Sequence, residues 1–272
     1  MSAPHRFDAF AARTAAQPPG VIAYLTAGDG GCAKTVAAMH GVEEGGASAL
    51  ELGVPHSDPV ADGPVLQAAA ARALRAGFRT RDLLTCLEQY RAEGGRLPIA
   101  LFGYANVLAE RATGDFYRAL AEAGADALAI PDLPREEAED VIASSEAAGL
   151  RMVFFVAPNT GESRLSAAAE ASTAFLYAVA RRGTTGNDTE FDAELSSYLG
   201  RVRRAAGSAP VAVGFGFSRA EQVRALQGRA DHAVVGTALV RALEGVPVSE
   251  AGAVARTFLQ SLRSQTPFPT TR

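Results

Sequence analysis

Eight short apolar runs recur about every 30 residues along this 272-residue chain, and this spacing constrains the fold more than any other feature. The runs are nearly continuous in apolar residues, as in strands that helices cover on both faces. They lie at residues 21–25, 49–52, 98–102, 127–131, 152–156, 174–178, 210–214 and 232–235. The pattern predicts an α/β chain with eight βα units, which is the size of a (β/α)8 TIM barrel. A doubly wound sheet would usually carry a G-x-G-x-x-G turn after its first strand, and residues 28–33 lack that spacing.

Two of the intervals are longer than the rest, about 50 residues after the second predicted strand and about 36 after the sixth. Loops that follow the strands form the active face of such a barrel, so we expect the chemistry in these two extended loops. We expect residues 1–272 to form one domain. Within it, residues 1–19 form an N-terminal helical segment that closes the barrel with Phe7 and Phe10, and residues 265–272 form a disordered tail.

The charge balance excludes several classes of function. Thirty acidic and 26 basic side chains give a formal net charge of −4, without the basic surface that nucleic acids or anionic membranes require. No apolar run reaches the length of a membrane span, and the N-terminus lacks the apolar core of a signal peptide, so we expect a cytoplasmic protein. The scattered histidines predict no metal site. Cys32 and Cys86, 54 positions apart, are expected to be buried apolar side chains rather than a disulfide or zinc ligands.

Lys34 is the only lysine, and its surroundings predict a helix rather than a strand end. Schiff-base chemistry needs a lysine amine of lowered pKa in the active site. We therefore expect neither an imine-forming aldolase mechanism nor pyridoxal phosphate (PLP) bound to this chain.

Two carboxylates are the main catalytic candidates. Glu51 lies near the end of an apolar strand, where burial would raise its pKa and allow proton transfer near neutral pH; alternatively it points outward or bonds to a neighbouring strand. Asp62 lies in the proline-stiffened loop GVPHSDPVADGPVLQ behind it. There it can either cap the next helix or bind a substrate, and the spacing favours neither.

Other polar and glycine residues follow the predicted strands. The turns after the last two strands contain Gly214, Gly216 and Gly236, each leading into a helix. Such turns favour a phosphate ligand over tight packing alone, because backbone N–H groups and a helix N-terminus meet there. The segment ARRGTTGNDTEF, with Arg181 and Thr185, has the polarity of a lid that closes over a substrate.

Taken together, the string LELGVPHSDPVADGP strongly resembles the signature of the tryptophan synthase alpha subunit family. The strings YLTAGD, FGYAN, IPDLP, VAPNT, RRGTTG, GFGFS and VVGTALV follow in the family's order. The resemblance therefore spans residues 21–242. It departs from the usual family pattern at Gly30, Ala180 and Thr184, and none of these changes removes the two carboxylates.

The resemblance implies a lyase of tryptophan biosynthesis that cleaves indole-3-glycerol phosphate to indole and glyceraldehyde 3-phosphate by a retro-aldol step. Glu51 would be the acid/base residue and Asp62 would stabilise positive charge at the indole N–H. Tyr104 would line the indole pocket, Tyr177 would position Glu51, and Thr185 would hold Asp62 when the lid closes. The remaining substrate-binding residues would be Arg181 at the lid and a phosphate cradle of Gly186, Gly214, Phe215, Gly216, Gly236 and Thr237.

The family also implies a partner. Indole would pass to a PLP-dependent beta subunit in an alpha2beta2 complex, so the cofactor would belong to the partner and this chain would need none. Pro55, His56, Asp58 and Pro59 would face that subunit. The open alternatives are a stand-alone indole-releasing paralogue, a catalytically silent activator of a beta subunit, and another phosphosugar isomerase on the same barrel.

Overall fold

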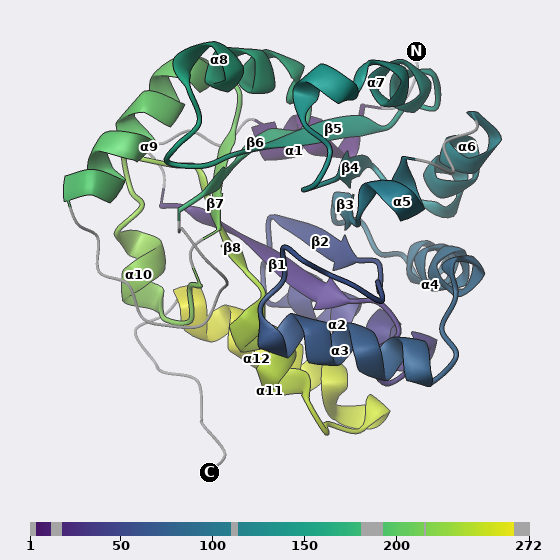
Figure 1. Ribbon diagram of the computed structural model, residues 1–272. Coiled ribbons are helices and arrows are strands. Elements are labelled where there is room, and N and C mark those ends of the chain that lie inside the picture. The colour runs from purple at the N-terminus through teal and green to yellow at the C-terminus, as the bar shows by residue number, and fades with distance from the viewer. Residues whose placement is uncertain (1–3, 12–17, 110–113, 181–192, 215, 264–272) are drawn as a thin grey trace.

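The computed structural model describes residues 4–11, 18–109, 114–180, 193–214 and 216–263, and it confirms the predicted barrel (Figure 1). All neighbouring strands pair in parallel and in chain order, and β8 pairs with β1 to close the barrel. The strands are β1 (Gly20–Thr26), β2 (Ala49–Gly53), β3 (Ile99–Phe102), β4 (Ala127–Ala129), β5 (Arg151–Val156), β6 (Phe175–Val179), β7 (Val211–Gly214) and β8 (His232–Val235). Each lies within two residues of its expected position.

Helices surround the barrel, except α1, which lies across one end of it (Figure 1). They are α1 (Arg6–Ala11), α2 (Cys32–Glu44), α3 (Pro64–Arg75), α4 (Thr80–Ala92), α5 (Ala105–Leu108), α6 (Gly114–Ala123), a 3₁₀ turn η1 (Arg135–Glu137), α7 (Glu139–Ala147), α8 (Glu162–Ala171), α9 (Ala193–Ala206), α10 (Ala220–Arg224), α11 (Thr237–Leu243) and α12 (Val248–Arg263). The long interval after β2 contains two of them, α3 and α4. None of the helices in the described residues is long and apolar enough to cross a bilayer.

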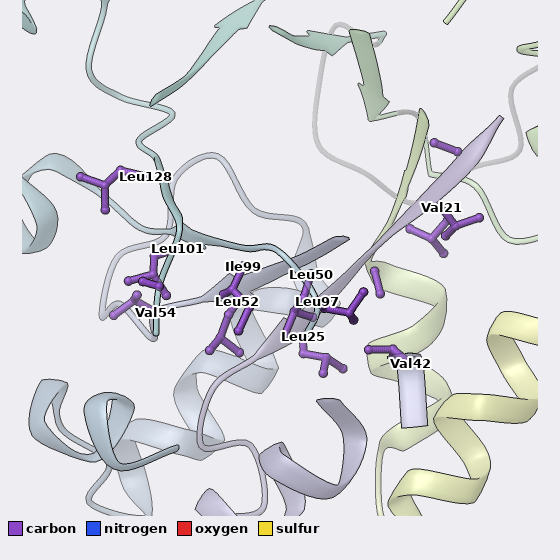
Figure 2. Close-up of a cluster of buried hydrophobic side chains, with 14 of the residues drawn as sticks. Val21, Leu25, Val42, Leu50, Leu52, Val54, Leu97, Ile99, Leu101 and Leu128 are labelled. Atoms are coloured by element: carbon purple, nitrogen blue, oxygen red, sulfur yellow. The ribbon is translucent and has the colours of Figure 1, made fainter. Parts of the chain in front are cut away.

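Two apolar cores follow from the alternation of side chains along each strand. Outward-facing residues pack under the helices; Figure 2 shows Val21, Leu25, Leu50 and Leu52 of β1 and β2 with Val42 of α2. Inward-facing residues form a second cluster in which alanines of several strands leave room for aromatic rings of others. The barrel interior is therefore a packed core rather than a pore.

The N-terminal helix closes the barrel at the amino ends of the strands, as expected. Phe7 and Phe10 of α1 are buried, and both rings contact Phe175 of β6. Phe10 also stacks on His232 of β8 at a centroid distance of 3.8 Å. The tail after residue 263 lies outside the described residues, so the expectation for 265–272 has no structural test.

Two buried aspartates hold the same end of the barrel. The Asp126 carboxylate accepts hydrogen bonds from the Ile99 backbone N–H at 2.8 Å and from Arg91 at 2.9 Å, and Arg6 pairs with it at 2.7 Å. Asp231 repeats the arrangement at the start of β8 with the Val211 N–H and Arg203. Charge-assisted hydrogen bonds of this kind stabilise the strand starts, away from the face where the active site is expected.

The expectation for the cysteines was wrong on one point. Cys86 of α4 is fully buried as predicted, but it forms a disulfide with Cys32, the first residue of α2, across a Cα–Cα distance of 5.5 Å. The 54-residue separation suggested that the two cysteines lie far apart. They are close because α2 and α4 lie side by side on the outside of the barrel. Separation along the sequence does not exclude a contact between helices of neighbouring βα units.

The glycine pair between α2 and α12 gives a stability prediction. A Cβ on Gly41 would clash with the backbone carbonyl of Gly252, and a Cβ on Gly252 would lie 3.0 Å from the Ala37 carbonyl. Because backbone cannot move aside as a flexible side chain can, Gly41→Ala is expected to lower the free energy of unfolding by about 1–3 kcal/mol in urea denaturation.

Gly200 of α9 is the matched control, because only the tip of Arg204, 3.7 Å away, is near its Cβ position. Gly200→Ala is expected to stabilise by about 0.5–1 kcal/mol through helix propensity alone. Equal effects of the two substitutions would contradict the close helix contact.

Candidate active site

A cavity of about 240 Å³ opens at the carboxyl ends of the strands. Its wall combines the two predicted carboxylates, glycines of β7 and β8, and a majority of apolar and aromatic side chains. The lining residues are Tyr24, Glu51, Ala61, Asp62, Gly63, Leu66, Phe102, Pro131, Phe155, Tyr177, Val179, Gly214, Gly216, Val234, Gly236 and Thr237. An apolar slot with a few convergent polar groups is typical of a small-molecule site.

Glu51 points into this cavity from β2 rather than outward. Its side chain is only 2% exposed, and Oε1 has no hydrogen-bonding partner among the described residues. Burial raises the pKa of Glu51 to about 8, and the negative charge of Asp62 adds to the rise. A carboxyl group in this environment is protonated at neutral pH and able to give up its proton, as a general acid requires.

Asp62 lies at the end of the loop after β2, and the structure excludes one of its two interpretations. The N-cap of α3 is Gly63, with no side-chain cap, so Asp62 does not cap the helix. Its Oδ2 instead accepts a hydrogen bond from the Tyr104 hydroxyl at 3.2 Å. Burial raises the pKa of Asp62 to about 6, and the Tyr104 bond and the nearby His56 oppose the rise. At pH 7 Asp62 is largely ionised beside a largely neutral Glu51.

Tyr104 fixes the loop that carries Asp62. Besides its bond to Asp62, its hydroxyl accepts the Ala61 backbone N–H at 2.9 Å. Tyr104 is not among the cavity-lining residues, so its contact with the site runs through Asp62. Asp132, at the end of the next strand, accepts the Ala105 N–H at 2.9 Å and so fixes the turn after β3.

Tyr24 and Tyr177 lie near Glu51 inside the barrel. The hydroxyl of each packs against a glycine, where a side chain would leave no room for it. A Cβ on Gly214 would collide with the Tyr177 hydroxyl, and a Cβ on Gly53 with the Tyr24 hydroxyl. Burial raises the pKa of both phenols well above 10, and the carboxylates of Glu51 and Asp62 contribute to the rise. Both phenols are therefore neutral at physiological pH and keep the proton that a hydrogen-bond donor needs.

The glycine side of the cavity joins the ends of β7 and β8. Gly214 and Gly216 come from the turn after β7, and Gly236 and Thr237 lie at the start of α11. Gly216 has a φ of +73°, in the left-handed region that glycine adopts without strain. No lysine or arginine lines the cavity within the described residues, so an anion there would depend on backbone N–H groups and the helix N-terminus.

Comparison with known proteins decides the family. A family model described as tryptophan synthase alpha chain matches residues 10–265. The tryptophan synthase alpha chain of Burkholderia pseudomallei (strain 1106a) is 37% identical over 259 residues, covering 94% of each chain. That of Cupriavidus metallidurans is 37% identical and covers 93% of this chain and 96% of its own length. This chain belongs to the tryptophan synthase alpha chain family.

Solved structures agree with this assignment. The tryptophan synthase complex of Pyrococcus furiosus matches with a TM-score of 0.80 and 32% identity, over 89% of this chain and 97% of that one. A second structure, from the alpha2beta2 complex of the same organism, matches with a TM-score of 0.82 and 34% identity over the same shares. The tryptophan synthase alpha chain family consists of lyases of tryptophan biosynthesis, and the chain is one of them.

The residues that the family resemblance singled out fall into three groups. Glu51, Asp62, Tyr177, Gly214, Gly216, Gly236 and Thr237 line one cavity. Tyr104 contacts the site through Asp62 and Ala61. Arg181, Thr185, Gly186 and Phe215 lie outside the described residues.

The four expected interface residues of this alpha chain differ in exposure. Asp58 is exposed and His56 is partly buried, whereas Pro55 and Pro59 are buried and stiffen the loop instead. His56 lies between two neighbours: its Nδ1 accepts the Asp58 N–H at 3.0 Å, and its Nε2 lies 2.8 Å from the Asn106 amide. Val60, 66% exposed beside them, is one of the two most exposed large apolar side chains in the described residues.

Aromatic side chains of the site were not predicted from the sequence. Tyr24, Phe102 and Phe155 reach the cavity from β1, β3 and β5, and neighbouring rings contact each other at centroid distances of 5.8 and 6.1 Å. The three residues lie inside runs that predict buried strands, where aromatic residues are common for packing alone. Because side chains alternate between the two faces of a strand, a barrel model would have placed these three residues on the inward face.

Proposed function

We propose that the chain cleaves indole-3-glycerol phosphate to indole and glyceraldehyde 3-phosphate, with Glu51 and Asp62 as its catalytic residues. The observation that carries this proposal is the pair of carboxyls in one apolar cavity, with the pKa of Glu51 raised to about 8 and that of Asp62 to about 6. Such a pair supplies an acid and an anion at the same pH.

In the proposed reaction, neutral Glu51 gives its proton to the indole ring carbon that bears the side chain. The Asp62 carboxylate accepts a hydrogen bond from the indole N–H and stabilises the positive charge that protonation creates. Glu51 then takes the proton of the adjacent side-chain hydroxyl, and the carbon–carbon bond breaks. Its electron pair returns to the ring, so that indole and an aldehyde leave and Glu51 is neutral again.

The indole ring would lie in the aromatic slot formed by Phe102, Phe155 and Leu66, and the phosphate on the glycine side of the cavity at Gly214, Gly216, Gly236 and Thr237. The neutral form of Glu51 favours this placement, because it removes one negative charge from a site that must accept a phosphate dianion. Arg181, Thr185, Gly186 and Phe215 are proposed to complete the site from the lid and the turn after β7. Tyr104 would then act on Asp62 and so on the indole end.

The position of the only lysine supports a mechanism without an imine. Lys34 lies outside the barrel on α2, where its Nζ donates a hydrogen bond to the Leu243 carbonyl at 2.7 Å. It is not among the cavity-lining residues. PLP is therefore proposed for a beta subunit rather than for this chain, and the complex is proposed to work in the cytoplasm. The exposed Asp58 and Val60 and the partly buried His56 form the rim to which that subunit would bind.

The first experiment is an indole-release assay of the purified chain with indole-3-glycerol phosphate, with and without the beta subunit from the same organism. We expect slow release alone and roughly tenfold or greater stimulation by the partner, as for two sites coupled through an interface. Fast release that ignores the partner would identify a stand-alone lyase. Absence of indole in both assays, with activation of the beta reaction, would identify a silent activator.

A further inference from the structure

The order of the strands indicates where the glycerol part of the substrate must lie, if the proposed function holds. The proposed phosphate cradle is at the ends of β7 and β8, and Glu51 is on β2. In the closed barrel β1 lies between β8 and β2 and pairs with both. The shortest path from the phosphate to the reacting carbon therefore crosses the end of β1.

The inward residue of β1 at this level is Tyr24. It is the register partner of Glu51 on β2, and it lines the cavity although its side chain is only 6% exposed. Its ring also contacts Phe102, in an edge-to-face arrangement at 5.8 Å, which fixes the ring's orientation.

The ring of Tyr24 extends from the phosphate side towards the acid side of the cavity. A Cβ on Gly236 would lie 3.2 Å from the Tyr24 Cβ and 3.4 Å from its Cγ, so the base of the ring is beside the proposed cradle. The hydroxyl at the other end occupies the space above Gly53, two residues after Glu51. The phenol thus reaches from the proposed cradle to β2, the strand that carries Glu51.

We propose that Tyr24 is a substrate-binding residue whose hydroxyl bonds the middle hydroxyl of the glycerol chain, on the carbon between the reacting carbon and the phosphate-bearing carbon. This contact would orient the neighbouring hydroxyl towards Glu51. The role suits a neutral phenol: burial and the nearby carboxylates keep the pKa of Tyr24 far above neutral pH, so the hydroxyl retains its proton for donation.

The test pairs a variant without the phenol hydroxyl with a ligand without the chain hydroxyls. Wild type and Tyr24→Phe are compared by kcat/KM for indole-3-glycerol phosphate and by the inhibition constant of indole-3-propyl phosphate, which has the same ring and phosphate. We expect kcat/KM to fall about 3- to 10-fold, the range of one neutral hydrogen bond, and the inhibition constant to stay within about twofold.

Tyr117→Phe is the matched control. It removes another buried tyrosine hydroxyl, which donates to the Leu108 carbonyl on the outside of the barrel, and it should leave the ratio of the two constants unchanged. If Tyr24→Phe weakened kcat/KM and inhibitor binding by the same factor, Tyr24 would have a packing role only, and the proposal would be wrong. It would also be wrong if neither constant changed. If wild type neither releases indole nor binds indole-3-propyl phosphate, the proposed function fails, and the proposal for Tyr24 fails with it.

Discussion

Glu51→Gln is expected to lower kcat for indole release by about 10³-fold while leaving KM within a few-fold of wild type. The amide has nearly the shape of the carboxyl group, so the cavity and its apolar slot remain. It has no proton to give at neutral pH and cannot take one from the substrate hydroxyl. Both proton transfers of the proposed reaction are therefore lost together. The ring and the phosphate of the substrate still bind, so KM changes little.

Steady-state kinetics of indole release at pH 7, with and without a beta subunit, measure this effect. Glu122→Gln provides a control, because Glu122 is exposed on α6 and should leave kcat unchanged. Retention of more than about a tenth of kcat by Glu51→Gln would remove Glu51 from the mechanism. It would leave Asp62 as the remaining ionisable carboxyl on the cavity wall in the described residues.

The barrel could be predicted from the sequence, because every strand is a buried apolar run and the runs recur at the spacing of a βα unit. The same periodicity brought Glu51 to a strand end. It did not show whether Glu51 faced inward. Ala49, Glu51 and Gly53 are alternate residues of β2 and therefore face the same side of the sheet. Which side is the interior is known only once the barrel is closed.

Contacts between distant segments were harder to predict. Asp62 had two equal interpretations, because a turn before a helix that begins with proline looks the same whether or not its aspartate caps the helix. The structure excluded the cap, since the Asp62 carboxylate bonds to Tyr104, 42 residues away. Cys32 and Cys86 required knowledge of which helices lie side by side. Tyr24 was missed because tyrosine in a strand is ordinary, and its position became notable only when β1 was found between β2 and β8.

The burial of Glu51 that supports catalysis should also reduce the stability of the fold at alkaline pH. In the unfolded chain the group titrates near its ordinary pKa of 4.5, and in the folded protein at about 8. Below the lower value both states are protonated. Between the two values the unfolded state loses the proton and the folded state keeps it, so the free energy of unfolding falls as pH rises. Above about pH 8 both states are ionised, and the free energy of unfolding falls no further on account of Glu51.

Glu51→Gln removes this ionisation and is therefore expected to gain stability over wild type as pH rises. The two proteins should be nearly equal near pH 4.5, and at pH 9 the variant should be more stable by roughly 2–4 kcal/mol in urea denaturation. The exposed Glu122→Gln should differ from wild type by less than about 0.5 kcal/mol at either pH. A pH-independent difference between Glu51→Gln and wild type would mean that the carboxyl is not held in its neutral form. The general-acid role would then lose its physical basis, since the proton that stabilises the folded state is the one proposed to reach the indole ring.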